Sequence, residues 1–141
     1  MNSMPTIPPL ATFRAGPTQS KTVLVVDDFE PICDLVARHL SADGYRVLTA
    51  NDAVEAQKII ESGVGPQIDL LLTEDEMPGL SGAELAEWFV RQRPEAKVLL
   101  MSRCENLPES KRRACLQKPF SWETLGAAVR QAWTPHGIAQ N

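Results

Sequence analysis

Five polar side chains stand immediately after apolar runs of the chain: Asp27, Asp28, Glu74, Ser102 and Lys118. Three of them are carboxylates, and carboxylates that are forced together repel one another, which raises their pKa or demands a cation. A hard divalent ion meets that demand through oxygen ligands, and magnesium takes one or two carboxylates while keeping several waters. If the fold gathers these residues, the sequence therefore predicts an acidic, cation-binding pocket.

Short apolar runs alternate with stretches of helical spacing from Lys21 onward. The runs predict strands at residues 23–26, 45–49, 68–73 and 98–101, with a short last strand before Lys118. Strands that alternate with helices predict an α/β fold, a doubly wound five-stranded parallel sheet covered on both faces. In such sheets ligands bind beyond the carboxyl ends of the strands, where the strand order reverses. Position alone thus predicts that the polar side chains share one pocket.

The helices are expected from their caps and their apolar stripes. Pro31 suits the first turn of the first helix, Asp52 and Glu55 are spaced like a capping box, as are Ser81 and Glu84, and Ser121 caps the last helix. The side chains expected to face the core are Ile32, Leu35, Val36, Leu40, Val54, Ile59, Ile60, Leu85, Trp88, Phe89, Leu125, Val129 and Trp133.

Charge and composition exclude several classes of function. The chain has 141 residues and a net charge of -4, and its only basic cluster, residues 111–113, is expected to be a solvated loop face. Neither a nucleic-acid partner nor a membrane partner is therefore expected. No apolar stretch approaches the roughly 20 residues of a membrane span, so we expect a soluble, cytoplasmic protein. The three cysteines lack C-x-x-C spacing, which favours reduced thiols over a zinc site or a disulfide framework.

The chain divides into one domain and two tails. Residues 1–20 contain four prolines and no periodic apolar pattern, which predicts a flexible tail. Residues 21–133 carry the whole alternating pattern and form the expected domain, and residues 134–141 form a C-terminal tail. A domain of this size buries a core without metals or disulfides.

The motifs V-V-D-D, E-M-P-G-L-S-G, L-L-M-S and L-Q-K-P-F, in this order over residues 21–133, resemble the receiver domain of two-component response regulators. The resemblance implies a flavodoxin-like sheet and a role in phosphorelay signal transduction. It also implies a phosphate-accepting aspartate three residues before the Met77-Pro78 pair and five after Asp69. Both counts fall on Glu74, so a glutamate occupies the phosphoacceptor position.

The same resemblance implies a role for each remaining pocket residue. Asp28, Glu74 and the backbone carbonyl of Glu76 would hold a magnesium ion, with Asp27 acting partly through water. Lys118 would pair with the acceptor carboxylate and with phosphoryl oxygens, and Ser102 would hydrogen-bond a phosphoryl oxygen.

Three departures from the family pattern limit what carries over. Glu74 is longer than the usual aspartate by one methylene, and near-attack geometry tolerates little displacement, so it should accept phosphate poorly or mimic it partially. Cys115 stands at the switch position, where the family usually has an aromatic ring. The stretch between Ser102 and Lys118 is about five residues short, more than one helical turn at 3.6 residues, which predicts a shortened fourth helix.

These observations favour a stand-alone receiver domain that is not an enzyme, binds Mg²⁺ weakly and acts by protein–protein interaction. Its expected partners are a histidine kinase or phosphorelay protein, a downstream target protein, or both, and a homodimer is an option. Two alternatives stay open. One is a conventional magnesium-dependent switch that accepts phosphate on Asp75 or Glu74. The other is a constitutive interaction or dimerisation module with a vestigial pocket.

Overall fold

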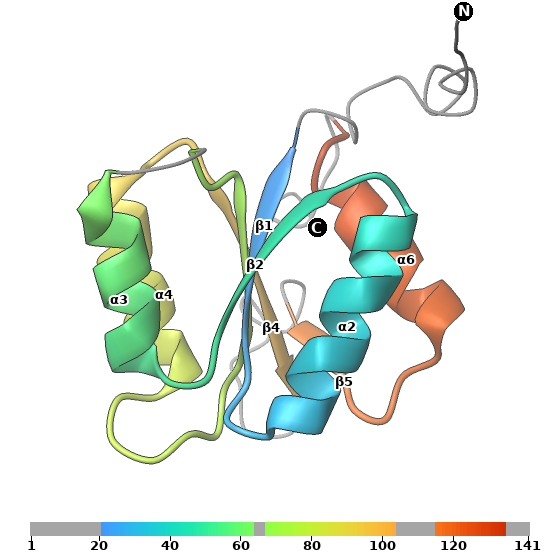
Figure 1. The fold of residues 1–141 in the computed structure, drawn as a ribbon, viewed down its shortest axis with the longest axis horizontal. Helices are drawn as coiled ribbons and strands as arrows, with labels where there is room; N and C mark the ends of the chain where they lie inside the picture. The colour runs from blue at the N-terminus through green and yellow to red at the C-terminus, as the bar shows by residue number, and fades with distance from the viewer. Residues whose placement is uncertain (1–20, 64–66, 104–114, 135–141) are drawn as a thin grey trace, which may run out of the picture.

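The computed structural model describes residues 21–63, 67–103 and 115–134 (Figure 1). Its sheet is built from strands Thr22–Val26 (β1), Arg46–Ala50 (β2), Leu70–Glu74 (β3), Lys97–Ser102 (β4) and Cys115–Gln117 (β5). All neighbouring strands pair in parallel, in the order β2-β1-β3-β4-β5. The expected five-stranded parallel sheet is confirmed.

Four described helices cover the two faces of this sheet: Glu30–Ala42 (α2), Ala53–Ser62 (α3), Gly82–Gln92 (α4) and Trp122–Gln131 (α6). Figure 1 shows α3 and α4 on one side of the sheet and α2 and α6 on the other. The arrangement is the doubly wound, flavodoxin-like fold expected from the alternation of strands and helices. The shortened helix expected between Ser102 and Lys118, which is not α4, lies outside the described residues. So do the two expected tails, apart from Thr134.

The central strands β1 and β3 are buried at every position, because helices cover both of their faces. Alternate side chains of β1 enter different cores. Val23 and Val25 pack on the side of α2 and α6, and Leu24 and Val26 pack on the side of α3 and α4. Apolar packing on both faces therefore fixes the positions of β1, which precedes Asp27, and of β3, which ends at Glu74.

The predicted helix starts are confirmed. The Asp52 side chain accepts a hydrogen bond from the Glu55 amide at 2.7 Å. Ser81 and Glu84 form a complete capping box at the start of α4. Ser121 accepts from the backbone of the first turn of α6. These caps fix where each helix leaves the edge of the sheet.

Two expected core residues are wrong. Leu35 of α2 is 44% exposed and Val54 of α3 is 57% exposed. The buried face of α2 carries Cys33 between the expected positions, and α3 buries small alanines rather than its single valine. No helix within the described ranges is long and apolar enough to cross a membrane.

Candidate functional site

Asp27 and Glu74 lie side by side at the point where the strand order reverses. β1 and β3 are neighbours in the sheet, and Val26 of β1 pairs in register with Thr73 of β3. Asp27 follows Val26 directly, and Glu74 is the last residue of β3. Asp27 is 1% exposed and Glu74 is 7% exposed. Two nearly buried carboxylates therefore share one end of the sheet, as the sequence predicts.

Lys118 reaches both of these carboxylates from the residue after β5. Its Nζ lies 3.4 Å from Asp27 Oδ2 and donates a hydrogen bond to Glu74 Oε1. Burial by itself lowers the pKa of Lys118, but the hydrogen bond to Glu74 and the charge of Asp27 outweigh it, so the pKa is raised. The lysine therefore stays an ammonium ion and balances part of the buried negative charge.

Backbone amides satisfy the other oxygen of each carboxylate. Glu74 Oε2 accepts from the Glu76 amide at 2.9 Å, and Asp27 Oδ1 accepts from the Phe29 amide at 2.9 Å. Each carboxylate thus has one backbone donor and shares Lys118 as the second partner. This arrangement fixes the orientation of both acids and leaves their charges compensated by a side chain of the same chain.

Asn51 also supports the site, and sequence reasoning missed it. Its side-chain Nδ2 donates to the Asp27 carbonyl at 3.2 Å, while its backbone N–H donates to Glu55 Oε1 at 2.8 Å. Asn51 directly follows the last residue of β2, the strand next to β1, which places it at the same sheet edge. Only this position at the end of a predicted strand could have pointed to Asn51 in the sequence. A hydrogen bond to a backbone carbonyl does not require a particular partner residue and so leaves no sequence motif.

Asp28 differs from the two buried carboxylates in its exposure to solvent. It is exposed, and within the described ranges no group of three or more His, Cys, Asp or Glu side chains is gathered for a metal ion. The expected metal ligands Asp28, Glu74 and the carbonyl of Glu76 therefore stay a prediction. The carboxylate oxygens of Asp27 and Glu74 are of the type that magnesium takes. In this structure the Lys118 ammonium supplies the positive charge between them.

Ser102 lies at the same edge, where the backbone ties it to Lys118. It is the last residue of β4 and 6% exposed, and its carbonyl accepts from the Lys118 amide at 2.8 Å. Its Oγ lies 3.4 Å from Cys115 Sγ. Cys115, the half-buried first residue of β5, is disulfide-bonded, which corrects the expectation of a reduced thiol there.

Asp75 performs a structural task instead of entering the pocket. Its Oδ1 accepts from the Ala83 amide at 2.9 Å, in the first turn of α4, and its carbonyl accepts from the Gly82 amide at 2.9 Å. A Cβ on Gly82 would stand 2.1 Å from the Glu74 carbonyl oxygen. The start of α4 is therefore seated directly on the backbone of the acceptor position.

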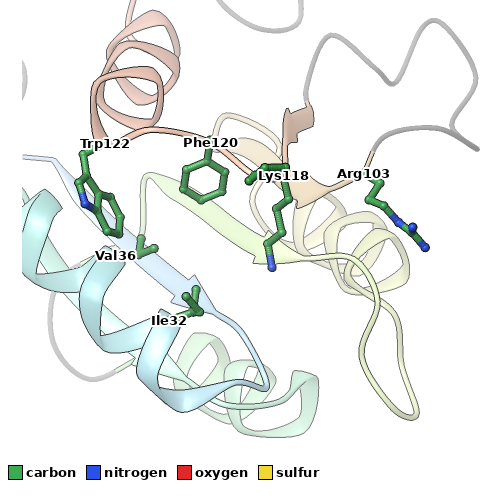
Figure 2. A pocket seen from close by; sticks show the side chains of 7 residues that line it. Ile32, Val36, Arg103, Lys118, Phe120 and Trp122 are labelled. Carbon is green, nitrogen blue, oxygen red and sulfur yellow. The ribbon is translucent and has the colours of Figure 1, made fainter.

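An apolar cavity of about 490 Å³ adjoins the acid pocket (Figure 2). Its walls come from α2, from the end of β4 and from the segment between β5 and α6: Ile32, Val36, Arg103, Lys118, Pro119, Phe120 and Trp122. Figure 2 shows Lys118 between Phe120 and Arg103, and the same lysine reaches Glu74. Lys118 is thus common to the cavity and to the acid pocket.

Known proteins share both this sequence pattern and this fold. The sensor kinase CckA of Brucella abortus is 30% identical over 118 residues, 79% of this chain and 12% of that protein. The two-component response regulator ORR6 of Oryza sativa is 34% identical over 98 residues, 68% of this chain and 56% of that protein. The chain thus spans less than two thirds of the length of these relatives.

Solved structures of receiver domains match almost over their full length. The receiver domain of the hybrid histidine kinase CckA has a TM-score of 0.67 at 33% identity, covering 80% of this chain and 99% of that chain. The response regulator TrrA of Thermotoga maritima, solved with Mg²⁺ and BeF, has a TM-score of 0.68 at 31% identity, covering 78% and 96%. A family model of the response regulator receiver domain matches residues 23–130. The chain belongs to the response regulator receiver domain family.

Proposed function

We propose that this receiver domain signals by binding another protein and that Glu74 prevents it from cycling through phospho-aspartate. The observation that carries the proposal is the fixed carboxylate of Glu74, which Lys118 and the Glu76 amide hold at the acceptor position. The domain is then a signalling module without enzymatic activity of its own.

The extra methylene of Glu74 is the physical reason. It advances the carboxylate by about 1.5 Å, the length of one C–C bond, whereas productive attack needs reacting atoms placed about 3–3.5 Å apart in one direction. The carboxylate supplies about one negative charge, compared with the 1.5 to 2 of a phosphoryl group. Glu74 therefore accepts phosphate poorly and acts as a partial mimic of the phosphorylated form.

Receiver domains generally bind Mg²⁺, and we extend this to weak binding by this chain. Asp28, Glu74 and the carbonyl of Glu76 would hold the ion, and Asp27 would act partly through water. When bound, magnesium neutralises carboxylate and phosphoryl charge. Affinity is weak because Lys118 already compensates both Asp27 and Glu74.

The partner is a histidine kinase or another phosphorelay protein, a downstream target, or both. Support comes from TrrA, which has also been solved in complex with the histidine kinase ThkA and has a TM-score of 0.69 to this chain in that complex. The net charge of -4 disfavours a nucleic-acid partner. A cytoplasmic location fits such an exchange between proteins.

Glu74→Asp tests the proposal. We expect wild type to gain little or no phosphate from acetyl phosphate. The variant should gain one magnesium-dependent, hydroxylamine-labile phosphoryl group, measured by intact mass. Glu61→Asp is the matched control, because it shortens an exposed glutamate in the last turn of α3, outside the acid pocket. Labelling of wild type as readily as the variant would show that Glu74 is not the block.

The two alternatives make different predictions. Phosphate acceptance on Asp75 is disfavoured because its side chain is hydrogen-bonded to the start of α4. If Asp75 were the acceptor, wild type would be labelled and Asp75→Asn would lose that label. A vestigial pocket predicts that a partner binds Glu74→Ala and wild type equally well. A partial mimic predicts weaker binding of Glu74→Ala.

A further inference from the structure

The strand β2 forms one edge of the sheet, with α2 on one face and α3 on the other (Figure 1). Among the described residues it pairs with β1 alone. Native proteins commonly protect such an edge with a lysine, a proline or a bulge. β2 has none of these, because its sequence is RVLTA and its register with β1 is one-to-one. Its outer side is therefore suited to a further strand.

Two residues of β2 direct their backbone groups to this outer side. The Arg46 amide and the Ala50 carbonyl bond to the residues that flank β1, so Arg46 and Ala50 face inward. Successive residues of a strand point their backbone groups to alternate sides. Val47 and Thr49 therefore present their amides and carbonyls at the open edge.

The spacing of these two residues suits pairing with a second copy of the chain. Directly opposite residues of an antiparallel pair can exchange both of their backbone hydrogen bonds. A two-fold axis through Leu48 sets Val47 opposite Thr49 of the partner subunit and Thr49 opposite the partner's Val47. Every outward amide and carbonyl of both residues then has a partner. Arg46, the one charged residue of β2, lies opposite the partner's Ala50, so like charges do not meet across the strands.

A groove of about 690 Å³ runs along this edge, between α2 and β2. Its walls include Asp34, Leu35 and Arg38 of α2 and Val47 of β2. Asp34 and Arg38 are exposed and carry opposite charges, and Leu35 is 44% exposed. The outer face of α2 thus offers an apolar side chain together with one charge of each sign.

Hydrogen bonds fix the level of α2 relative to β2. Cys33 Sγ donates to the carbonyl of Ala50, the last residue of β2. The Leu40 carbonyl accepts from the amide of the residue that precedes β2. Between these two contacts, Val36 in the middle of α2 lies at about the level of Leu48 in the middle of β2. The two-fold axis through Leu48 therefore passes close to the level of Val36.

This position of the axis makes the charges of α2 complement themselves. Asp34 and Arg38 stand two residues to either side of Val36. The axis sets Asp34 beside Arg38 of the partner subunit, and symmetry repeats the contact. A two-fold interface uses the same patch on both subunits, so a patch must be self-complementary in this way. Complementary charges select one register over others.

We propose that β2 and the outer face of α2 form a homodimer interface, in which two sheets join through an antiparallel pair of β2 strands. The interface covers Leu35 and satisfies the outward backbone groups of Val47 and Thr49. The inference goes beyond the proposed function and does not depend on whether Glu74 accepts phosphate.

Charge exchange on α2 tests the interface, with the mass in solution measured by sedimentation at increasing protein concentration. Wild type should rise from the mass of one chain towards that of two. Arg38→Glu sets like charges beside Asp34 at both contacts and should weaken association at least about tenfold. The double variant Asp34→Lys/Arg38→Glu exchanges the charges and should restore association. Arg91→Glu makes the same charge change on the exposed surface of α4 and is the matched control, with association unchanged.

The backbone pairing has its own test. Thr49→Pro removes an outward amide and keeps the pairing with β1, since an edge strand tolerates proline where its amide faces solvent. The variant should stay monomeric. In wild type, hydrogen exchange of the Thr49 amide should slow as protein concentration rises. The Leu48 amide, which faces β1, is the internal reference and should be slow at every concentration.

Four results would overturn the proposal. One is a wild type that keeps the mass of one chain at every concentration. Another is a dimer that persists in both Arg38→Glu and Thr49→Pro, because the interface then lies elsewhere. A third is an equal loss of association in Arg38→Glu and Arg91→Glu, which indicates a general charge effect. The fourth is Thr49 protection that does not depend on concentration, because another segment of the same chain then covers the edge. Restored association in the double variant, with concentration-dependent protection of Thr49, supports it, and this pair of readings decides the question even if Thr49→Pro fails to fold.

Discussion

Replacing Gly82 with alanine should destabilise the fold, because α4 begins in contact with the backbone of the acceptor position. The added Cβ would stand 2.1 Å from the Glu74 carbonyl oxygen and 2.8 Å from Asp75 Cα. A carbon and a carbonyl oxygen normally approach no closer than about 3.3 Å, so the helix must retreat by roughly 1 Å. Both neighbours are backbone atoms, which cannot turn away as a side chain can.

The size of the effect follows from opposing contributions. Inserting a methyl group into packed backbone costs about 1–3 kcal/mol, and the smaller entropy of the unfolded alanine chain offsets about 0.4–1 kcal/mol. The net loss is about 1–2 kcal/mol. In a domain of this size, that lowers Tm by roughly 4–8 °C. The retreat should also disturb the Asp75 contacts at the start of α4, which include the Gly82 amide.

Gly126→Ala is the matched control within the same chain. Gly126 lies inside α6, and its added Cβ would meet the end of the Arg130 side chain at 3.2 Å, a group that can move. Alanine is favoured over glycine inside a helix by about 0.5–1 kcal/mol, so this variant should be more stable than wild type. Urea denaturation and calorimetry measure both changes. A Gly82→Ala variant as stable as wild type, or two variants that shift together, would refute the reasoning.

Two further variants probe buried polar groups. Burial raises the pKa of the Cys33 thiol from 9.0 to about 11. The neutral thiol therefore contributes stability below pH 9 that is lost as the pH rises towards 11, at most about 2.7 kcal/mol. Urea denaturation should show this loss in wild type, and an equal loss in Cys33→Ala would contradict it. Trp133→Phe removes the Trp133 Nε1 donor to Tyr45 Oη at 3.0 Å and should cost about 1 kcal/mol. Burial raises the pKa of Tyr45 and this bond offsets part of the rise, so absorbance titration should find a still higher tyrosine pKa in the variant.

The sequence predicted the sheet and the convergence of its acidic ends because those features follow from local patterns. Continuous apolar runs mark strands covered on both faces, and β1 and β3 are buried throughout. Capping spacings located the helix starts, and Ser81 with Glu84 forms the expected box. A residue that directly follows a buried parallel strand reaches the pocket edge, as Asp27 does.

Other features have no local pattern. The apolar stripe of a helix has blurred borders, so Leu35 was expected in the core although it is 44% exposed. Asn51 acts through the backbone carbonyl of Asp27, which any residue could offer. The exposure of Asp28 beside the buried Asp27 depends on how the chain turns after β1, and the spacing of two adjacent aspartates does not determine that turn.

The contact between Lys118 and Asp27 joins residues 91 positions apart in the chain, and the contact with Glu74 joins residues 44 apart. Such pairings form only after the intervening chain has been ordered, since closing a long loop costs entropy before the contact forms. We therefore expect the lysine to reach its carboxylates late in folding, when β1, β3 and β5 already lie in one sheet. An interaction that is absent from the transition state slows unfolding without speeding folding. We thus expect the ion pair at the acceptor position to lengthen the lifetime of the native state.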